Sequence, residues 1–162
     1  MSKSILYIMG VSGTGKTTIG KLLAKTLQIP FYDGDDYHPK KNIEKMASGH
    51  ALDDNDRYGW LTALNELAIN NKETGAVIAC SALKEKYRAQ LQEAIEKESV
   101  FIYLKGTYDE IKSRLDNRKG HYMSSKLLKS QFDTLEEPND AISVSIIQTP
   151  EQILQEILNQ LK

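Results

Sequence analysis

Apolar positions along the chain form short unbroken runs that alternate with stretches of helical periodicity. The runs lie at residues 5–9, 76–80 and 100–104, and such runs are typical of strands buried on both faces of a parallel sheet. A glycine-rich turn follows the first run, and residues 17–27 then repeat apolar side chains at helical spacing, with Gly20 weakening the pattern only slightly. The pattern predicts a strand, a glycine loop and a helix in that order.

The rest of the chain continues this alternation. Residues 84–97 have the length and composition of a helix that connects the second and third apolar runs. A capping-box pattern predicts a helix over residues 107–117, and residues 142–147 predict a last strand. An amphipathic helix that begins at Pro150 closes the chain. Strands that alternate with helices imply an α/β fold, in which a mostly parallel sheet is covered on both faces.

Composition and charge narrow the class of protein. Of 162 residues, 40% are hydrophobic and 27% charged, which is typical of one soluble globular domain, expected here over residues 1–162. A net charge of -1 offers no positive field that could hold nucleic acid. The first apolar run is too short for a signal peptide or a membrane span, and Cys80, the single cysteine, follows apolar residues as a core residue would. We therefore expect a cytoplasmic protein without disulfides or membrane contact.

The loop after the first strand carries the most specific motif. Residues 10–17 read GVSGTGKT and match the Walker A pattern, GxxxxGK followed by Ser or Thr. Glycines let backbone amides converge on phosphate oxygens, and the following helix adds the positive end of its dipole. Lys16 is expected to reach the β and γ phosphates of ATP, and Thr17 to offer its hydroxyl to Mg²⁺. The flanking strand and helix argue against an accidental glycine turn.

These observations predict a P-loop NTPase fold, a three-layer sandwich with a central parallel sheet flanked by helices. The residues expected to bind the nucleotide in this loop are Gly10, Val11, Ser12, Gly13, Thr14, Gly15, Lys16, Thr17 and Thr18.

An acidic cluster follows the short apolar segment after the first helix. Many P-loop proteins place a magnesium carboxylate at the end of a second strand, but Cys80 and Ser81 stand there in this chain. Asp33 and Asp35 would share a face of an extended segment beside the phosphate loop. We expect Asp33 to support the metal through water, and Asp35 to accept a hydrogen bond from the substrate hydroxyl and orient it toward the γ phosphate. The alternative is a solvated acidic turn.

Longer motifs follow one another along the chain, namely GVSGTGKTT, DGDDYHPKKNIEKMASGHALDDNDRYGWL, CSALKEKYR and RKGHYMSSKLLKSQFDTLEEP. In these motifs, with their order and spacing, the chain resembles the small bacterial and eukaryotic gluconokinases, which are similar in fold to shikimate kinase and the nucleoside monophosphate kinases. The resemblance covers nearly the whole chain. The resemblance implies ATP-dependent phosphorylation of the terminal hydroxyl of D-gluconate to 6-phosphogluconate, and it also implies a homodimer.

Gluconate is a polyol with one carboxylate, so its pocket needs hydrogen-bonding groups and a fixed cation. Arg57 is the first candidate for the carboxylate, because it opens a helix whose apolar residues, Trp60 among them, can anchor it. Lys84 and Arg88 share a helical face beyond the central strand and are further candidates, although any exposed helix can carry such residues. His38 can bond sugar hydroxyls, with an ordinary helix cap as the alternative.

A basic segment between two helices predicts a mobile lid at about residues 118–125. Arg118 and Arg114 are expected to close over the phosphates, offset charge in the transition state and exclude water, whereas a basic surface loop is the alternative for this segment. His121 and Gln131 match the family signature as substrate-binding residues, but their roles do not follow from chemistry alone. Pro150, together with Arg118, is placed near the adenine by position only.

Two rival functions remain open on the sequence. A kinase for another small polar acceptor, such as shikimate or a nucleoside monophosphate, would carry the same Walker A loop. A nucleotide-dependent switch or assembly ATPase belongs to a different class and normally shows the second carboxylate strand end that this chain lacks.

Overall fold

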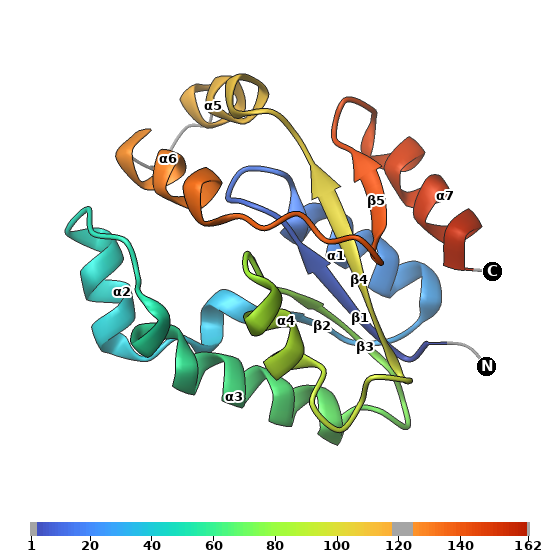
Figure 1. The fold of residues 1–162 in the computed structure, drawn as a ribbon. Coiled ribbons are helices and arrows are strands. Elements are labelled where there is room, and N and C mark those ends of the chain that lie inside the picture. Colours follow the sequence, from blue (N-terminus) through green and yellow to red (C-terminus); the bar gives the residue numbers. More distant parts are fainter. Residues whose placement is uncertain (1–2, 118–124, 162) are drawn as a thin grey trace.

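The central feature of the computed structural model, which describes residues 3–117 and 125–161, is a five-stranded parallel sheet. Its strand order is β2-β3-β1-β4-β5 (Figure 1). Strand β1 is central, with Ile5 paired to Ala76 of β3 on one side and to Ser99 of β4 on the other. The strands are β1 (Ile5–Met9), β2 (Phe31–Asp33), β3 (Ala76–Ala79), β4 (Ser99–Lys105) and β5 (Ile142–Ser145).

Helices connect successive strands and lie on both faces of the sheet. They are α1 (Lys16–Leu27), α2 (Lys40–Ala47), α3 (Asp54–Asn70), α4 (Glu85–Leu91), α5 (Tyr108–Asp116), α6 (Ser125–Thr134) and α7 (Pro150–Leu161), with a short 3-10 helix η1 (Gly34–Tyr37) after β2. The three-layer α/β sandwich with a parallel sheet is therefore confirmed. Among the described residues, no helix has both the length and the apolar character needed to cross a membrane.

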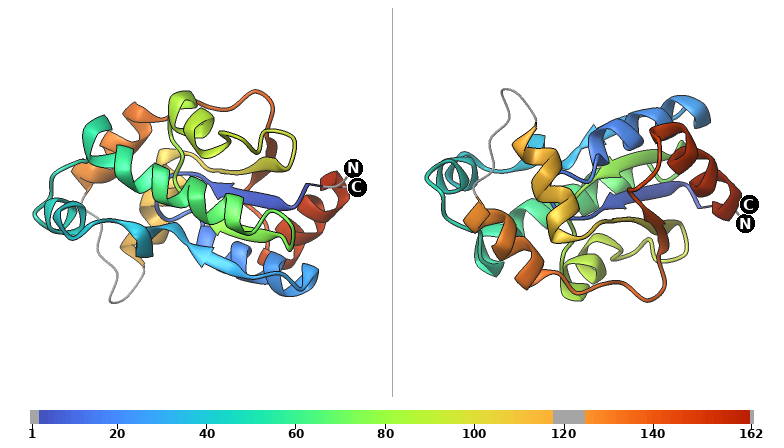
Figure 2. Two further views of the ribbon diagram at one scale, coloured as in Figure 1. Left: turned by 90° about the horizontal axis from the view of Figure 1, so that it is seen from below. Right: turned by 90° about the horizontal axis from the view of Figure 1, so that it is seen from above.

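Alternation along β1 divides the core into two halves. Leu6 and Ile8 face α1, α5 and α7, whereas Ile5, Tyr7 and Met9 face α3 and α4. The two views of Figure 2 show these helix layers from opposite sides, with α3 in front of the sheet in one view and α5 and α7 in the other. Every residue of β1 is buried, as expected for a strand covered on both faces.

The strands all point toward one end of the molecule, where the loop after β1 lies with α2, α5 and α6 (Figure 1). Parallel topology brings the carboxyl ends of the strands together, and this is the edge at which α/β folds bind ligands. The fold therefore brings the Walker A loop, the acidic residues Asp33 and Asp35, and Arg57 of α3 to one edge of the sheet, although these segments are far apart in sequence.

Gly20 has a packing role that its weak helix propensity did not reveal. It is buried in α1, and a Cβ added there would lie 2.4 Å from Cε1 of Phe31 in β2. The missing side chain thus lets β2 approach α1, which carries Lys16 and Thr17. This close approach places the acidic end of β2 beside the phosphate loop.

Two local predictions were wrong. The helix expected over residues 84–97 ends at Leu91, and the chain then turns, with Ala94 in a left-handed conformation (φ 68°), so that Ile95 is buried before β4 begins. The expected extended segment through Asp35 ends at Asp33, because the Asp33 side chain accepts a hydrogen bond from the Asp35 backbone N–H and caps η1. The two acids are brought together by a cap and not by strand alternation.

Candidate active site

The loop between β1 and α1 forms a cup lined by backbone groups. Gly15 is the N-cap of α1 and lies in the left-handed region at φ 92°, a conformation that glycine adopts without steric cost. Lys16 folds back over the loop and donates hydrogen bonds from Nζ to the carbonyls of Gly10 (2.8 Å) and Val11 (3.0 Å). Burial lowers the pKa of Lys16, and the charge of Asp35 opposes this shift. A phosphate oxygen that enters the cup would offer Lys16 an anionic partner.

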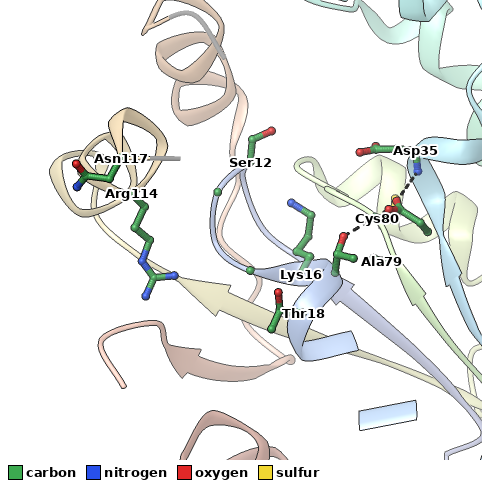
Figure 3. A pocket seen from close by; sticks show the side chains of 12 residues that line it. Ser12, Lys16, Thr18, Asp35, Ala79, Cys80, Arg114 and Asn117 are labelled. Atoms are coloured by element: carbon green, nitrogen blue, oxygen red, sulfur yellow. Dashed lines mark hydrogen bonds between the residues drawn. The ribbon is translucent and has the colours of Figure 1, made fainter. Parts of the chain in front are cut away.

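A cavity of about 580 Å³ opens above this cup. Figure 3 shows Lys16 near its centre, with Asp35 on one side and Arg114 and Asn117 on the other. Its lining residues are Ser12, Gly13, Gly15, Lys16, Thr17, Thr18, Asp33, Asp35, Ala79, Cys80, Arg114 and Asn117. The lining combines residues of the glycine loop with two cations and two carboxylates, which suits a nucleotide polyphosphate with a divalent metal.

Thr17 and Asp33 meet at the floor of this first cavity. The Thr17 hydroxyl donates a hydrogen bond to Oδ2 of Asp33 over 3.4 Å. Mg²⁺ prefers oxygen ligands and is bound by one or two protein groups, with waters and phosphates completing its shell. This pair of oxygens fits that requirement. Within residues 3–117 and 125–161, no cluster of three or more acidic, histidine or cysteine side chains could hold a metal ion.

Asp35 lies where the first cavity meets a second one. Its side chain is 85% exposed in the open cleft, yet partial desolvation by the cleft walls, followed by the charge of Asp33, raises the pKa of its carboxyl. Lys16 opposes this rise. A carboxylate here can accept a hydrogen bond from a hydroxyl group in the second cavity and direct it toward the loop.

The second cavity has a volume of about 410 Å³ and lies between the phosphate loop, α2, α3 and α6. It shares Ser12, Lys16 and Asp35 with the first cavity, so these residues mark the junction of two adjoining chambers. The other lining residues are His38, Ile43, Met46, Ala47, Ala51, Leu52, Arg57, Trp60, Ser81, Leu83, Leu127, Ser130 and Gln131. The arrangement suits a small acceptor that is held beside a nucleotide.

One wall of the second cavity is made by His38 and Trp60. Their rings stack with centroids 4.0 Å apart, and the indole Nε1 of Trp60 donates a hydrogen bond to the carbonyl of Gly34 over 2.7 Å. Burial, followed by the nearby charge of Arg57, lowers the pKa of His38 to about 4. His38 therefore faces the cavity as a neutral group, and Trp60 ties this wall to the segment that carries Asp35.

Arg57, near the start of α3, adds a positive charge to the lining of the second cavity. A capping box formed by Asp53 and Asp56 fixes the start of that helix, and Trp60, Leu61 and Leu64 bury its inner face. Arg57 donates from Nη1 to the hydroxyl of Tyr87 over 3.0 Å. The helix is thus anchored as the sequence predicted, and Arg57 lines the second cavity.

Comparisons with known proteins agree with this geometry. The thermoresistant gluconokinase of Escherichia coli K12 is 46% identical, over 98% of this chain and 93% of that protein. The chain belongs to the gluconokinase family. A probable gluconokinase of Dictyostelium discoideum is 42% identical, over 99% of this chain and 87% of that protein. A crystal structure of a gluconokinase from Sinorhizobium meliloti 1021 superposes with a TM-score of 0.89 at 38% identity, covering 99% of this chain and 91% of that one.

A broader family model, described as shikimate kinase, matches residues 12–162. The match covers most of the chain and reflects the shared P-loop kinase fold. Membership of the gluconokinase family thus sits within a wider group of small-molecule kinases.

Against this family background, Gln131 has a clear structural place. Its Oε1 accepts a hydrogen bond from the Ser12 backbone N–H (2.7 Å), and its Nε2 donates to Ser12 Oγ (3.0 Å). Gln131 therefore fastens α6 to the phosphate loop while it lines the second cavity. The sequence marked this residue only through the resemblance, because a contact across 119 positions leaves no local pattern.

Several predicted residues lie elsewhere. Lys84 pairs with Asp54 (3.2 Å), and the buried Arg88 donates to the carbonyls of Ala82 (2.7 Å) and Glu136 (2.9 Å), so neither lines the two cavities. Pro150 begins α7 and also lies outside both linings. Arg118, His121 and the predicted lid up to residue 124 fall outside the described residues.

Other residues predicted to bind the nucleotide either support the phosphate loop from within or line the first cavity. Val11 and Thr14 are buried, and the Thr14 hydroxyl donates to the Val11 carbonyl over 3.1 Å, so their side chains support the loop from within. Thr18 lines the first cavity. Arg114 also lines it, while its Nη2 donates to the carbonyl of Ile146 over 2.7 Å.

Sequence reasoning missed most of the apolar lining of the second cavity and one polar residue of the first. Ile43 and Met46 of α2 and Leu127 of α6 line the acceptor side, and Asn117 lines the nucleotide side. The available sequence signal was Ile43 and Met46 at helical spacing among charged and polar residues, and in the structure Ile43 is 52% exposed.

Proposed function

We propose that the protein transfers the γ-phosphoryl group of ATP to the terminal hydroxyl of D-gluconate and releases 6-phosphogluconate and ADP. The observation that carries this proposal is the junction of two cavities at Ser12, Lys16 and Asp35, which puts a phosphate cup and an acceptor chamber side by side. Phosphoryl transfer depends mainly on such positioning and on charge stabilisation.

In the nucleotide chamber, the loop amides and Lys16 hold the terminal phosphates of ATP. Thr17 would hold Mg²⁺ through its hydroxyl and Asp33 would support it through water, and the ion would supply positive charge to the phosphate oxygens. Arg114 supplies a second cation to the same chamber, and Thr18 completes its floor. We assign Arg118 to charge stabilisation and, with Pro150, to the neighbourhood of the adenine.

In the acceptor chamber, Arg57 binds the gluconate carboxylate, because a guanidinium can donate to both of its oxygens. His38 and Gln131 bond hydroxyl groups, and His121 is assigned to the same task on the basis of the family resemblance. Asp35 accepts a hydrogen bond from the terminal hydroxyl and aims its oxygen at the γ phosphorus. Lys84 and Arg88 serve substrate binding through the elements that they hold in place.

The proposal extends to the whole chain. Residues 1–162 act as one kinase domain in the cytoplasm, with residues 118–125 as a lid that keeps water from the phosphates, and two copies associate as a homodimer. Gluconate and ATP are the partners, without nucleic acid or membrane.

An acceptor panel tests the substrate. ADP release is coupled to a spectrophotometric readout with ATP, Mg²⁺ and, in separate reactions, D-gluconate, shikimate, a nucleoside monophosphate or no acceptor. We expect turnover with gluconate at least a hundredfold above the other reactions, as is typical when a buried polar site is left unpaired by the wrong substrate. Turnover with shikimate but not gluconate would overturn the assignment, and equal hydrolysis in all reactions would favour a nucleotide switch.

A further inference from the structure

A short chain of hydrogen bonds runs from Arg57 to a carboxylate that lines neither cavity. Nη1 of Arg57 donates to the hydroxyl of Tyr87 over 3.0 Å, and that hydroxyl donates in turn to Oδ1 of Asp54. Tyr87 belongs to α4 and is only 3% exposed, while Asp54 is the first residue of α3. Neither Tyr87 nor Asp54 lines the acceptor chamber.

The direction of these hydrogen bonds is fixed by chemistry. A tyrosine hydroxyl has one proton, and here that proton goes to the Asp54 carboxylate. The hydroxyl oxygen must therefore accept from Arg57, and it engages one of the five N–H donors of the guanidinium. The guanidinium also lies over the Tyr87 ring, with Cζ 5.2 Å from the ring centroid. Arg57 is thus held from one side.

Charge is distributed so that Arg57 remains available to an anion. Asp54 pairs with Lys86 and Lys84, and hydrogen bonds from Lys86, Tyr87 and Lys84 hold the pKa of the Asp54 carboxyl well below its usual range. Within the described part of the chain, no carboxylate lies within 4.0 Å of the Arg57 guanidinium. The neutral hydroxyl holds the guanidinium in place and leaves its charge uncompensated.

We propose that Tyr87 and Asp54 are positioning residues that hold Arg57 ready for the carboxylate of the acceptor. This inference rests on the proposed function, in which Arg57 binds that carboxylate. An arginine side chain has many rotamers, and ordering it before the acceptor arrives removes that cost from binding. A direct pair between Arg57 and Asp54 would also order the side chain, but the acceptor would then compete with an internal anion.

Tyr87→Phe tests this role because it removes the hydroxyl and keeps the ring. We expect the KM for gluconate to rise roughly tenfold, the change typical of a lost hydrogen bond to a charged group, while kcat and the KM for ATP change less than twofold. Tyr103→Phe is the matched control, since Tyr103 is 4% exposed and its hydroxyl also donates to a carboxylate, Glu137, over 3.0 Å. Its KM for gluconate should stay at the wild-type value.

A crystal structure of Tyr87→Phe without acceptor adds a readout that does not depend on turnover. The Arg57 guanidinium is expected to leave its wild-type position in that variant. An unmoved Arg57 together with an unchanged KM would overturn the proposal, even when the wild-type enzyme phosphorylates gluconate. A wild-type enzyme inactive on gluconate would instead contradict the proposed function, and the position of Arg57 would still decide the positioning role.

Asp54→Asn is a second variant in case Tyr87→Phe does not fold. It keeps an oxygen for the Tyr87 hydroxyl and removes the negative charge, so a smaller rise in the KM for gluconate is expected, again without loss of kcat. A fall in kcat and kcat/KM together, with an unchanged KM, would assign Asp54 to another role and overturn this one.

Discussion

Asn42 donates a hydrogen bond from Nδ2 to Nδ1 of His38 over 3.2 Å, and this contact decides which ring nitrogen carries the proton. The orientation of the amide is set independently, because the same Nδ2 donates to the carbonyl of Asp56 over 2.8 Å. Nδ1 of His38 must accept, which leaves Nε2 as the donor of a neutral imidazole. Nε2 lies 4.0 Å from Oδ1 of Asp35. The acceptor chamber thus gains a hydrogen-bond donor beside the carboxylate that orients the substrate hydroxyl.

The first prediction concerns the titration of His38, whose pKa is lowered to about 4 in the folded chain. A histidine in the unfolded chain has a pKa of about 6.5, so between pH 6.5 and pH 4 the unfolded state binds more protons than the folded state. The free energy of unfolding should therefore fall as the pH decreases over this range, by at most about 3 kcal/mol. Urea unfolding at several pH values measures this slope, and His38→Gln should flatten it. An NMR titration midpoint near 6.5 for His38 would contradict the prediction.

The second prediction concerns Lys16, the cation inside the phosphate cup. Lys16→Ala should lower kcat by about 10² to 10³, because a positioned charge at the transferring phosphate is lost. The melting temperature should change little. Lys25→Ala removes an exposed lysine of the same helix and serves as the control, with activity expected to stay at the wild-type level. A Lys16→Ala enzyme with more than a tenth of wild-type kcat would exclude the assigned role.

The third prediction concerns Asp35. Asp35→Asn should lower kcat by about 10² or more while ATP binding changes little, because the lost group acts on the acceptor hydroxyl. In the wild-type enzyme only the ionised carboxylate can act, and its pKa is raised, so kcat/KM for gluconate should decline with falling pH at a higher pH than an ordinary aspartate would give. Full activity of Asp35→Asn, or a pH profile unaltered by the substitution, would remove this residue from the mechanism.

The fourth prediction concerns Arg57. Arg57→Ala should weaken gluconate binding roughly 10- to 100-fold, as expected for the loss of a charge-assisted hydrogen-bond pair. Calorimetric titration with gluconate measures this change, and titration with a non-hydrolysable ATP analogue, expected to match the wild type, shows that the nucleotide chamber is intact. An unchanged affinity for gluconate would show that a cation other than Arg57 binds its carboxylate.

The fifth prediction compares two helical glycines. Gly20→Ala should destabilise the fold by about 1 to 3 kcal/mol, because its Cβ would overlap the Phe31 ring. Gly59 of α3 has nothing within 4 Å of an added Cβ, so Gly59→Ala should stabilise the fold by about 0.5 to 1 kcal/mol. Thermal unfolding of both variants measures the difference. Equal effects in both variants would show that the Phe31 ring can move away from the added Cβ without loss of stability.

Elements governed by local patterns could be predicted from the sequence. The Walker A loop between β1 and α1 and the capping box of Thr107 and Glu110 at the start of α5 are confirmed, because each depends on residues within a few positions of one another. Cys80 is 2% exposed, as expected for a core residue, and it also borders the first cavity; burial raises the pKa of its thiol to about 12.

Contacts between distant segments could not be predicted. Arg88 has the same helical spacing as a surface cation, but its partners are carbonyls at Ala82 and Glu136, and only the folded chain shows that it is buried. The hydrogen bonds of Trp60 to Gly34 and of Gln131 to Ser12 are of the same kind. The side chains around the acceptor chamber come from the phosphate loop, α2, α3, α6 and the loops between them, and their mutual placement depends on tertiary packing, which periodicity does not encode.

Because Ser12, Lys16 and Asp35 border both chambers, the two chambers adjoin at these three residues. A single synthetic molecule could therefore occupy both at once, with an adenosine polyphosphate at one end, a sugar acid at the other and a phosphate bridge passing between the ammonium and carboxylate groups. On binding, such a bisubstrate inhibitor would lose the translational and rotational freedom of one molecule, whereas the two natural substrates lose that of two.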